Sequence, residues 1–240
     1  LNFGLIRYIV QECKRRNDGR TLEFVIATNL SPLDDEILEF CREHSVVLST
    51  SLDGPEELHN QNRPRPGRDS YQRTVTGIQR ARQVLGEDAV SALMTTTARS
   101  LAMPTEIIDE YLRQGFRSIF LRPISPYGFA LKSAAKIGYS SDAFLEFYEK
   151  GLRYILDLNR QGIGFREEFA SIILRKALTP FPTGYVDLQS PSGLGITVIV
   201  YNYDGDVYAS DEGRMLAETG DCSFRLGNVH KDAYRELFLN

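Results

Sequence analysis

The sequence predicts an α/β protein with a parallel sheet, followed by a small antiparallel region. Two observations predict this fold class. Amphipathic helical patterns alternate repeatedly with short apolar runs before Arg122, which is typical of parallel strands covered by helices. Near the C-terminus, β-branched and aromatic residues flank the dipeptide Asp204-Gly205, and this pattern indicates an antiparallel hairpin.

The composition is that of a globular protein. Of 240 residues, 42% are hydrophobic and 25% are charged, as expected for a folded core with a polar surface. The formal net charge of −4 provides no basic surface for a phosphate backbone, which argues against a nucleic-acid partner. No apolar run approaches the roughly 18 residues of a membrane span, and the first residues lack the order of a signal peptide. We therefore expect no membrane association and a cytoplasmic location.

The elements of the parallel region follow from hydrophobic spacing and turn residues. Apolar positions three and four apart predict helices, and short apolar runs that end in polar residues predict strands. The expected order is helix 5–13, strand 22–27, helix 34–44, strand 46–52, helix 71–85, strand 90–96, a helix that opens at Pro104, and strand 118–121. Residues 53–69, rich in Pro, Arg and Gly, are expected to form a polar loop.

After residue 121 the alternation stops. A long helix is expected over residues 142–160, although Gly151 in its interior costs about 1 kcal/mol relative to Ala. Residues 196–203 and 206–208 are expected to pair about the Asp204-Gly205 turn. Three parts follow: residues 1–140 with the parallel sheet, residues 141–184 as a helical connection, and residues 185–240 as the antiparallel region.

The cysteines and histidines do not form a metal-binding pattern. The three cysteines are Cys13, Cys41 and Cys222; they are too far apart in sequence for a ligand cluster, and an odd number argues against a disulfide framework. Cys13 and Cys41 follow apolar residues at helical spacing, so both are predicted to be buried. The histidines are scattered, and no metal ligands are predicted.

Polar residues gather where the predicted parallel strands end. In parallel α/β folds the carboxyl ends of the strands carry the site, because loops and backbone groups converge there. The residues at these ends are Thr28, Asn29, the segment 49–53, the threonines 95–97, Arg122 and Ser125. Hydroxyl, amide, carboxylate and guanidinium groups suit a polar ligand that carries hydroxyl, amino and carboxylate groups.

Several motifs together resemble a known family. The segments LSTSLDGPEELHNQNR, FVIATNL and FLRPISPYGFA resemble radical S-adenosylmethionine enzymes of the peptide-maturase type, and are similar to those of anaerobic sulfatase-maturating enzymes. The resemblance is strongest to the radical maturase of the His-Xaa-Ser peptide system. It rests on the segments TNLSPLDDEILEFC, SALMTTT, ILRKALTPF and VYNYDGDVYASDEGRML. Each motif is short, but their order and spacing are specific.

The resemblance implies a fold, cofactors and a substrate. The fold would be a partial parallel (β/α) barrel of the radical S-adenosylmethionine type, followed by an auxiliary-cluster (SPASM-like) hairpin region. In such enzymes a [4Fe–4S] cluster cleaves S-adenosylmethionine, and the 5′-deoxyadenosyl radical modifies a ribosomally made peptide or protein. The cluster-binding C-x-x-x-C-x-x-C loop of the family does not occur in this sequence. We therefore expect a core fragment, truncated at its N-terminus, which holds no metal, is inactive by itself and self-associates through its uncovered barrel face.

The resemblance also assigns candidate cofactor-binding residues. Ser51 matches the family's strand-end serine that contacts S-adenosylmethionine, and Ser49 points to the same side of the strand. Either Arg63 or Arg73 is expected to bind the cofactor carboxylate. Two further strand-end candidates are Asn29 and Arg122. The alternative for the arginines is pairing with Asp69, and His59 is interpreted as a packing residue of the loop.

The hairpin supplies one candidate catalytic residue. Sulfatase-type maturases carry the motif D-G-x-V-Y-x-C-D, in which the Cys ligates an auxiliary cluster and the last Asp is the base that acts on the substrate. The matching residues here are Asp204, Gly205, Val207 and Tyr208. Ser210 stands in place of the Cys, and a hydroxyl is a poor iron ligand, so this strand is not expected to hold a cluster. Asp211 occupies the acid's position.

Two alternatives to this interpretation remain open. One is a cofactor-independent barrel enzyme that uses Asp53, Arg122 and the threonines on a small sugar or phosphate. The other is a noncatalytic module whose exposed hairpin adds a strand to a peptide partner.

Overall fold

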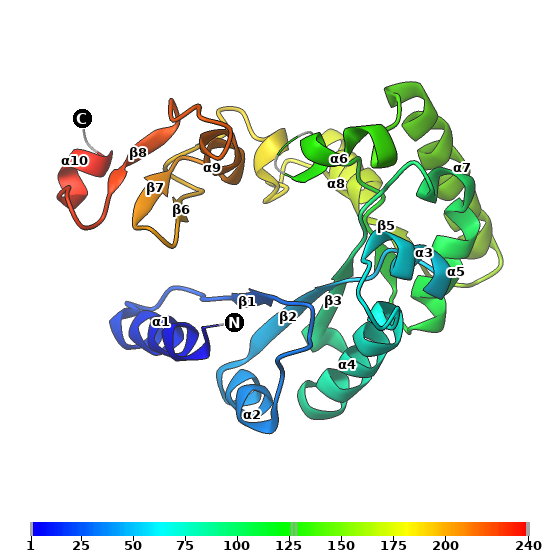
Figure 1. Ribbon diagram of the computed structural model, residues 1–240, viewed down its shortest axis with the longest axis horizontal. Coiled ribbons are helices and arrows are strands. Elements are labelled where there is room, and N and C mark those ends of the chain that lie inside the picture. Colours follow the sequence, from blue (N-terminus) through cyan, green and yellow to red (C-terminus); the bar gives the residue numbers. More distant parts are fainter. Residues whose placement is uncertain (1, 126, 128, 239–240) are drawn as a thin grey trace. The chain divides into compact units, whose positions relative to one another are not determined.

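The computed structural model describes residues 2–125, 127 and 129–238 (Figure 1). Pro126 and Gly128 of the FLRPISPYGFA motif lie outside the described residues. The helices are α1 Phe3–Arg16, α2 Asp35–His44, α3 Glu56–Asn62, α4 Ser70–Leu85, α5 Pro104–Arg113, α6 Phe129–Ile137, α7 Ser141–Arg160, α8 Glu168–Leu178, α9 Asp211–Ala217 and α10 Tyr234–Phe238. The strands are β1 Phe24–Ala27, β2 Val46–Ser51, β3 Val90–Leu93, β4 Ser118–Ile119, β5 Arg166–Glu167, β6 Val200–Tyr201, β7 Asp206–Tyr208 and β8 Arg225–Asn228.

The chain forms two compact units. The first unit comprises Leu1–Pro123 and Tyr139–Glu168, and the second comprises Ile124–Gly138 and Phe169–Asn240. The first contains a parallel sheet in the order β1-β2-β3 and a parallel pair β4-β5, and the second contains an antiparallel sheet in the order β6-β7-β8. The expectation of a parallel α/β region followed by a small antiparallel region is confirmed.

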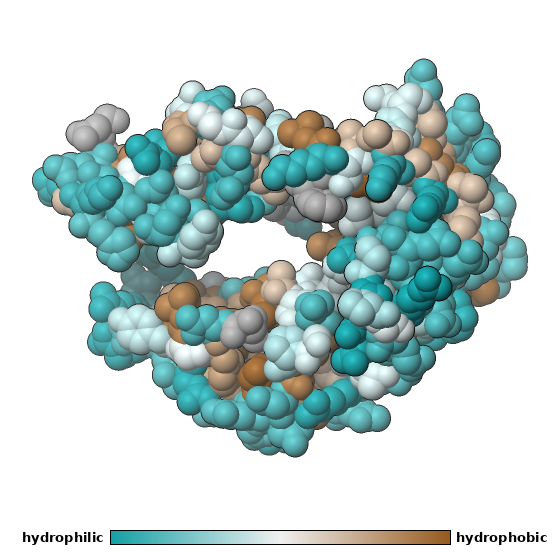
Figure 2. Space-filling view, in the orientation of Figure 1, coloured by the Kyte–Doolittle hydropathy of each residue, from teal (hydrophilic) through white to brown (hydrophobic). Residues whose placement is uncertain are grey.

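The sheet of the first unit has one buried face and one open face. Ile26, Leu48 and Val90 lie side by side in the register and are buried beneath the helices. Because successive side chains alternate between faces, Val25, Ser49 and Leu93 lie on the other face. Val25 is 55% exposed and Leu93 40% exposed, and Figure 2 shows part of this face as apolar surface beside β1 and β2.

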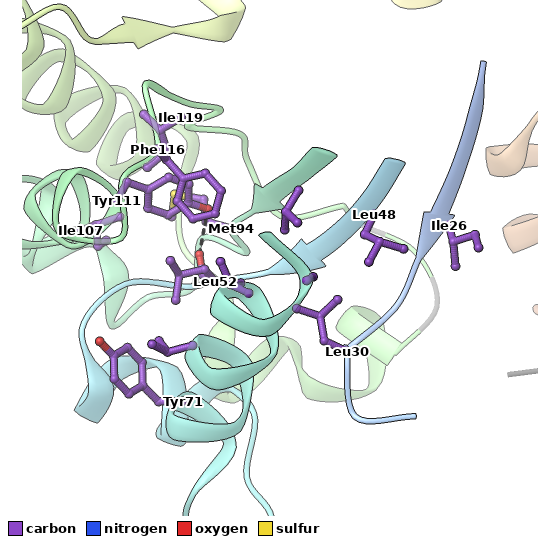
Figure 3. Packing of buried hydrophobic residues seen from close by; sticks show 14 of the residues in the cluster. Ile26, Leu30, Leu48, Leu52, Tyr71, Met94, Ile107, Tyr111, Phe116 and Ile119 are labelled. Carbon is purple, nitrogen blue, oxygen red and sulfur yellow. Dashed lines mark hydrogen bonds between the residues drawn. The ribbon is translucent and has the colours of Figure 1, made fainter. Parts of the chain in front are cut away.

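The buried face packs against the helices of the same unit. Figure 3 shows Leu48, Leu52, Ile107 and Tyr111 within this core, with the Tyr111 hydroxyl donating to the Leu52 carbonyl at 2.8 Å. All four residues are 0% exposed. Truncating such a leucine to alanine costs about 2–5 kcal/mol of unfolding free energy. The core therefore holds the chain just after β2 by packing and by a hydrogen bond to the Leu52 carbonyl.

The segment 53–69 is not a loop throughout, contrary to the sequence prediction. It contains α3, which begins after Pro55, a residue with φ −55° that suits a helix start. Leu58 and His59 are buried, so the helix is stabilised by tertiary packing rather than by a repeating apolar stripe. The predicted strands 22–27 and 90–96 are shorter than expected: β1 begins at Phe24 and β3 ends at Leu93. Beyond β3, the Thr95 N–H bonds to Asp53 Oδ1 and the Thr96 hydroxyl to the Arg122 carbonyl, in place of strand pairing.

One of the two cysteine predictions is wrong. Cys41 is buried as predicted, whereas Cys13 is exposed. The reason is that α1 buries a narrow stripe: Ile6 is half-buried and Val10 is buried, while the polar last turn that carries Cys13 remains at the surface.

The long helix α7 belongs to the first unit, whereas the sequence boundary falls at residue 140. Its buried residues Phe147, Gly151 and Ile155 belong to the packed side of the helix. A Cβ atom on Gly151 would lie 2.8 Å from Leu121 Cδ1. The glycine thus permits a close approach of α7 to the chain after β4, which accounts for its presence inside a helix.

The antiparallel unit differs from the predicted hairpin in extent. Val200 pairs with Tyr208 and Tyr201 with Val207, and β8 adds a third strand that the sequence did not predict. Residues 196–199 do not join β6, because Ile196 and Thr197 instead donate their N–H groups to the Gly193 carbonyl in a turn.

None of the helices among the described residues is both long and apolar enough to cross a bilayer.

Replacement of Gly151 by Ala is predicted to destabilise the protein, although helix propensity alone favours Ala by about 1 kcal/mol. The clash with Leu121 should cost about 1–3 kcal/mol, so the net loss of unfolding free energy, measured by urea denaturation, should be up to about 2 kcal/mol. Lys150→Ala, at the adjacent exposed position, is the control. A Gly151→Ala protein more stable than the natural sequence would contradict the packing described.

Candidate functional site

The carboxyl ends of β2 and β3 are joined by the buried carboxylate of Asp53. Its side chain is 0% exposed. Oδ2 accepts from Arg63 Nε at 2.8 Å and Oδ1 from Arg63 Nη2 at 3.2 Å, and Oδ1 also accepts the backbone N–H of Thr95 at 2.9 Å. The sequence predicted Asp53 at a strand end, at the start of a polar loop, and as a catalytic group only in the alternative of a cofactor-independent enzyme. The geometry instead makes it a connection between two strand ends.

His59 lies beneath the same segment and is buried, as its interpretation as a packing residue predicted. Its Nδ1 accepts the backbone N–H of Asp53 at 3.2 Å. In the neutral ring this leaves the proton on Nε2, which is 3.4 Å from the Thr74 hydroxyl oxygen. The ring therefore connects β2 to α4 as a neutral tautomer.

Polar groups after β3 form a second set of contacts. The Thr96 hydroxyl donates to the Arg122 carbonyl at 2.7 Å, and the Thr97 hydroxyl donates to Asn62 Oδ1 at 3.1 Å. Arg122 is exposed, and its guanidinium lies 5.4 Å from the centre of the Phe120 ring. These contacts use two threonine hydroxyls that the sequence predicted to contact a ligand.

A pocket of ≈ 430 Å³ opens at this rim of the first unit and gathers three of the predicted site residues: Asn29, Arg63 and Arg73. The other lining residues are Ser31, His59, Pro64, Arg65, Ser70 and Thr74. Three guanidinium groups face carboxylates at Asp53 and Asp69. The pocket thus offers cationic and hydroxyl groups, a donor set that suits an anionic, hydroxylated ligand. Sequence reasoning missed Arg65 and Ser70.

Asn29 reaches this pocket from a strained turn after β1. Leu30 has φ +62° and is buried, a left-handed conformation that costs a residue with a Cβ atom roughly 1–2 kcal/mol. A Cβ atom on Gly77 would lie 2.7 Å from the Leu30 Cβ atom, so the glycine on α4 provides room for the turn. Thr28 Oγ1 accepts the Leu30 N–H at 3.2 Å, which stabilises the same conformation.

The remaining predicted residues lie elsewhere. Ser49 and Ser51 are half-buried on the open face of β2 and do not line the rim pocket. Asp211 lies in the second unit, in the first turn of α9, where Arg214 Nη2 is 2.9 Å from its Oδ1 atom. Ser210 caps the same helix by accepting the Gly213 N–H at 3.1 Å, which gives the serine in the cysteine position a structural role.

The described residues do not match the ligand set of an iron–sulfur cluster. Cys13 and Cys222 are exposed and Cys41 is buried, and no group of three or more His, Cys, Asp or Glu side chains within the described ranges is placed to hold a metal. The thiolate ligands that such a cluster needs are therefore not assembled in this part of the chain.

The pH dependence of stability should report on His59. Burial lowers its pKa from the ordinary 6.5, and the Arg63 charge adds to this effect while Asp53 opposes it. The unfolded chain therefore binds a proton that the folded chain does not, so stability is present above pH 6.5 and is lost as pH falls below it, with a slope of at most about 1.4 kcal/mol per pH unit.

This effect can be measured by urea unfolding between about pH 7 and pH 5, a range in which histidine titrates. His59→Gln, which does not titrate, should remove this part of the slope. Equal slopes for both proteins would show that folding does not lower the pKa of His59.

Comparison with known proteins gives three informative similarities, although no known family model matches the chain. An uncharacterized protein of Methanothermobacter thermautotrophicus is 34% identical over 186 residues, which cover 73% of this chain and 64% of that protein. A cysteine-type anaerobic sulfatase-maturating enzyme of Clostridium perfringens is 23% identical, covering 95% of this chain and 60% of the enzyme. The solved structure of native anSMEcpe with bound AdoMet and Cp18Cys peptide aligns with a TM-score of 0.73 and 18% identity, covering 100% of this chain and 64% of that chain.

The chain spans less than two thirds of the length of each of these proteins. The agreement over nearly all of this chain extends beyond the short motifs that carried the original resemblance. The resemblance is therefore confirmed: in sequence and in fold, the chain is similar to radical S-adenosylmethionine enzymes of the anaerobic sulfatase-maturating type.

Proposed function

We propose that this chain is the core of a radical S-adenosylmethionine enzyme that modifies a peptide or protein. The observation that carries the proposal is the alignment of the whole chain with an enzyme solved with bound AdoMet and peptide. The polar strand ends and the cationic rim pocket of this chain supply groups that such a cofactor requires. The first unit would be the partial barrel and the second unit the SPASM-like region.

The rim pocket supports Arg73, rather than Arg63, as the partner of the cofactor carboxylate. The Arg63 guanidinium makes two bonds to a carboxylate that is 0% exposed, and withdrawing it would leave a buried charge unpaired. Arg73 is 54% exposed and pairs with Asp69, which is itself 39% exposed. Surface pairs of this kind contribute about 0–1 kcal/mol, so Arg73 can exchange its partner at little cost.

The other proposed cofactor contacts remain those at the strand ends. The hydroxyls of Ser49 and Ser51 lie on the open face of β2, and Asn29 lines the rim pocket. Arg122 stays a further candidate because its guanidinium is exposed at the end of the fourth strand. S-adenosylmethionine would supply the hydrogen-abstracting radical, and these residues would bind and orient it.

The iron–sulfur cluster itself is not assigned to residues of this chain. We propose that its thiolate ligands come from sequence outside these 240 residues, and that the chain alone is inactive. Asp211 is kept as the proposed proton acceptor in the second unit. For that role its ion pair with Arg214, at 2.9 Å, would have to open when substrate binds.

The open sheet face of the first unit is proposed to make the isolated chain self-associate. Val25 and Leu93 expose apolar surface on this face, and β1 is an edge strand whose unpaired backbone groups can accept another strand. Light scattering should show a mass above that of one chain, which decreases with dilution. A monomer at every concentration would contradict this proposal.

The assignment of Arg73 can be tested by calorimetric titration of S-adenosylmethionine into the full-length natural protein with its cluster reconstituted. Arg73→Gln should weaken binding by about tenfold, equivalent to ~1.4 kcal/mol. Arg80→Gln is the matched control, because Arg80 lies on the same helix and pairs with the exposed Asp35. Equal affinities for the two variants would remove Arg73 from the site, and absence of binding by the natural protein would overturn the proposed function.

A further inference from the structure

We propose that Asp53 is the positioning residue of this site: one buried carboxylate fixes the carboxyl ends of β2 and β3 to each other, with Arg63 as its counter-ion. The proposal rests on the proposed function for the identity of the ligand. Asp53 itself is 0% exposed, so it acts through the residues that it holds.

Asp53 lies just past the point where the backbones of β2 and β3 stop pairing. The last backbone bond between the two strand ends runs from the Leu52 N–H to the Leu93 carbonyl at 3.0 Å. Beyond it, the Thr95 N–H bonds to Asp53 Oδ1 at 2.9 Å. The side chain thus extends the pairing of β2 and β3 past the point where backbone pairing stops, into the segment that carries the threonines.

The buried Asp53 carboxylate also has a counter-ion, Arg63. A carboxylate that is removed from water must be neutralised and hydrogen-bonded. Arg63 does both through two bonds, and its Nη2 also donates to Thr95 Oγ1 at 3.3 Å. The same guanidinium therefore contacts both strand ends, which gives Arg63 a role that does not require contact with a ligand.

The backbone groups of Leu52 and Asp53 are held by side chains as well. The Asp53 N–H is bound by His59 Nδ1, and the Leu52 carbonyl is bound by the Tyr111 hydroxyl at 2.8 Å. His59 lies inside α3, and Arg63 is the residue that follows the last residue of this helix. Both side chains contact Asp53, so the short helix and its C-terminal residue hold Asp53 in place.

A second buried carboxylate in the same unit provides a matched control. Glu110 on α5 is 0% exposed. It accepts from the Tyr71 hydroxyl at 2.6 Å and from Gln114 Nε2 at 2.8 Å, and it pairs with Arg113. Its contacts lie among helices rather than strand ends, so Glu110→Gln removes an equally buried charge without touching the connection between β2 and β3.

The experiment compares Asp53→Asn, Asp53→Asn/Arg63→Gln and Glu110→Gln in the full-length natural protein. Two quantities are measured: the hydrogen exchange rates of the backbone amides of residues 95–97, and the dissociation constant of S-adenosylmethionine. Asp53→Asn should raise the exchange rates and the dissociation constant by about tenfold each. Glu110→Gln should lower the melting temperature but leave both quantities within about twofold.

The double variant separates positioning from stability. Arg63→Gln alone would leave the fully buried Asp53 carboxylate unpaired, whereas the double variant leaves no buried ion, so the melting temperature of the double variant should lie above that of Arg63→Gln. Exchange and affinity should stay impaired, because the Arg63 bonds that hold residue 53 and Thr95 together are still missing. If Asp53→Asn does not fold, Arg63→Lys keeps the charge but loses the paired bonds, and it should raise the exchange rates of residues 95–97.

Two results would overturn the proposal. One is that Asp53→Asn and Glu110→Gln lose affinity in proportion to their loss of stability. The other is that Arg63→Lys weakens binding while exchange at residues 95–97 stays unchanged, which would make Arg63 a ligand contact. If the natural protein does not bind S-adenosylmethionine, the proposed function fails, whereas the exchange rates still decide whether Asp53 connects the strands.

Discussion

The buried carboxylate of Asp53 imposes the constraint on which the rest of the site depends. It cannot remain in the interior without a cation and hydrogen-bond donors, and those partners are Arg63, just after α3, and the Thr95 N–H, just after β3. The segment between β2 and α4 must therefore fold back over the strand ends. The rim pocket is formed where it does so, with Arg63 in its wall and Arg73 and Asn29 around it.

The same constraint divides the arginines of this segment into two kinds. Arg63 is committed to a buried partner, whereas Arg73 shares a solvent-exposed partner with Arg65. Exposed pairs exchange partners readily because water replaces each contact. In such a site Arg63 and Asp53 stay fixed, while the Arg73 guanidinium remains available to a ligand. This arrangement fits the binding of an anionic group more closely than a surface of equivalent arginines would.

Local patterns predicted most of the first unit, because its strands and helices carry their own apolar spacing. They failed where long-range contacts decide the structure. The helix α3 has little apolar pattern beyond Leu58, and it is held by His59 and Arg63 against Asp53. The strand β8 reads as Arg-Leu-Gly-Asn and exists through its pairing with β7.

Likewise, two arginines in one polar segment looked equivalent until their carboxylate partners were located. No spacing rule distinguishes a buried aspartate in an Asp-Gly-Pro turn from an exposed one, because the burial comes from strands and helices distant in sequence.

The most direct test is backbone amide exchange of the full-length protein with and without S-adenosylmethionine. The account predicts that protection increases at residues 49–53, 63–73 and 95–97, and an increase confined to other segments would contradict it.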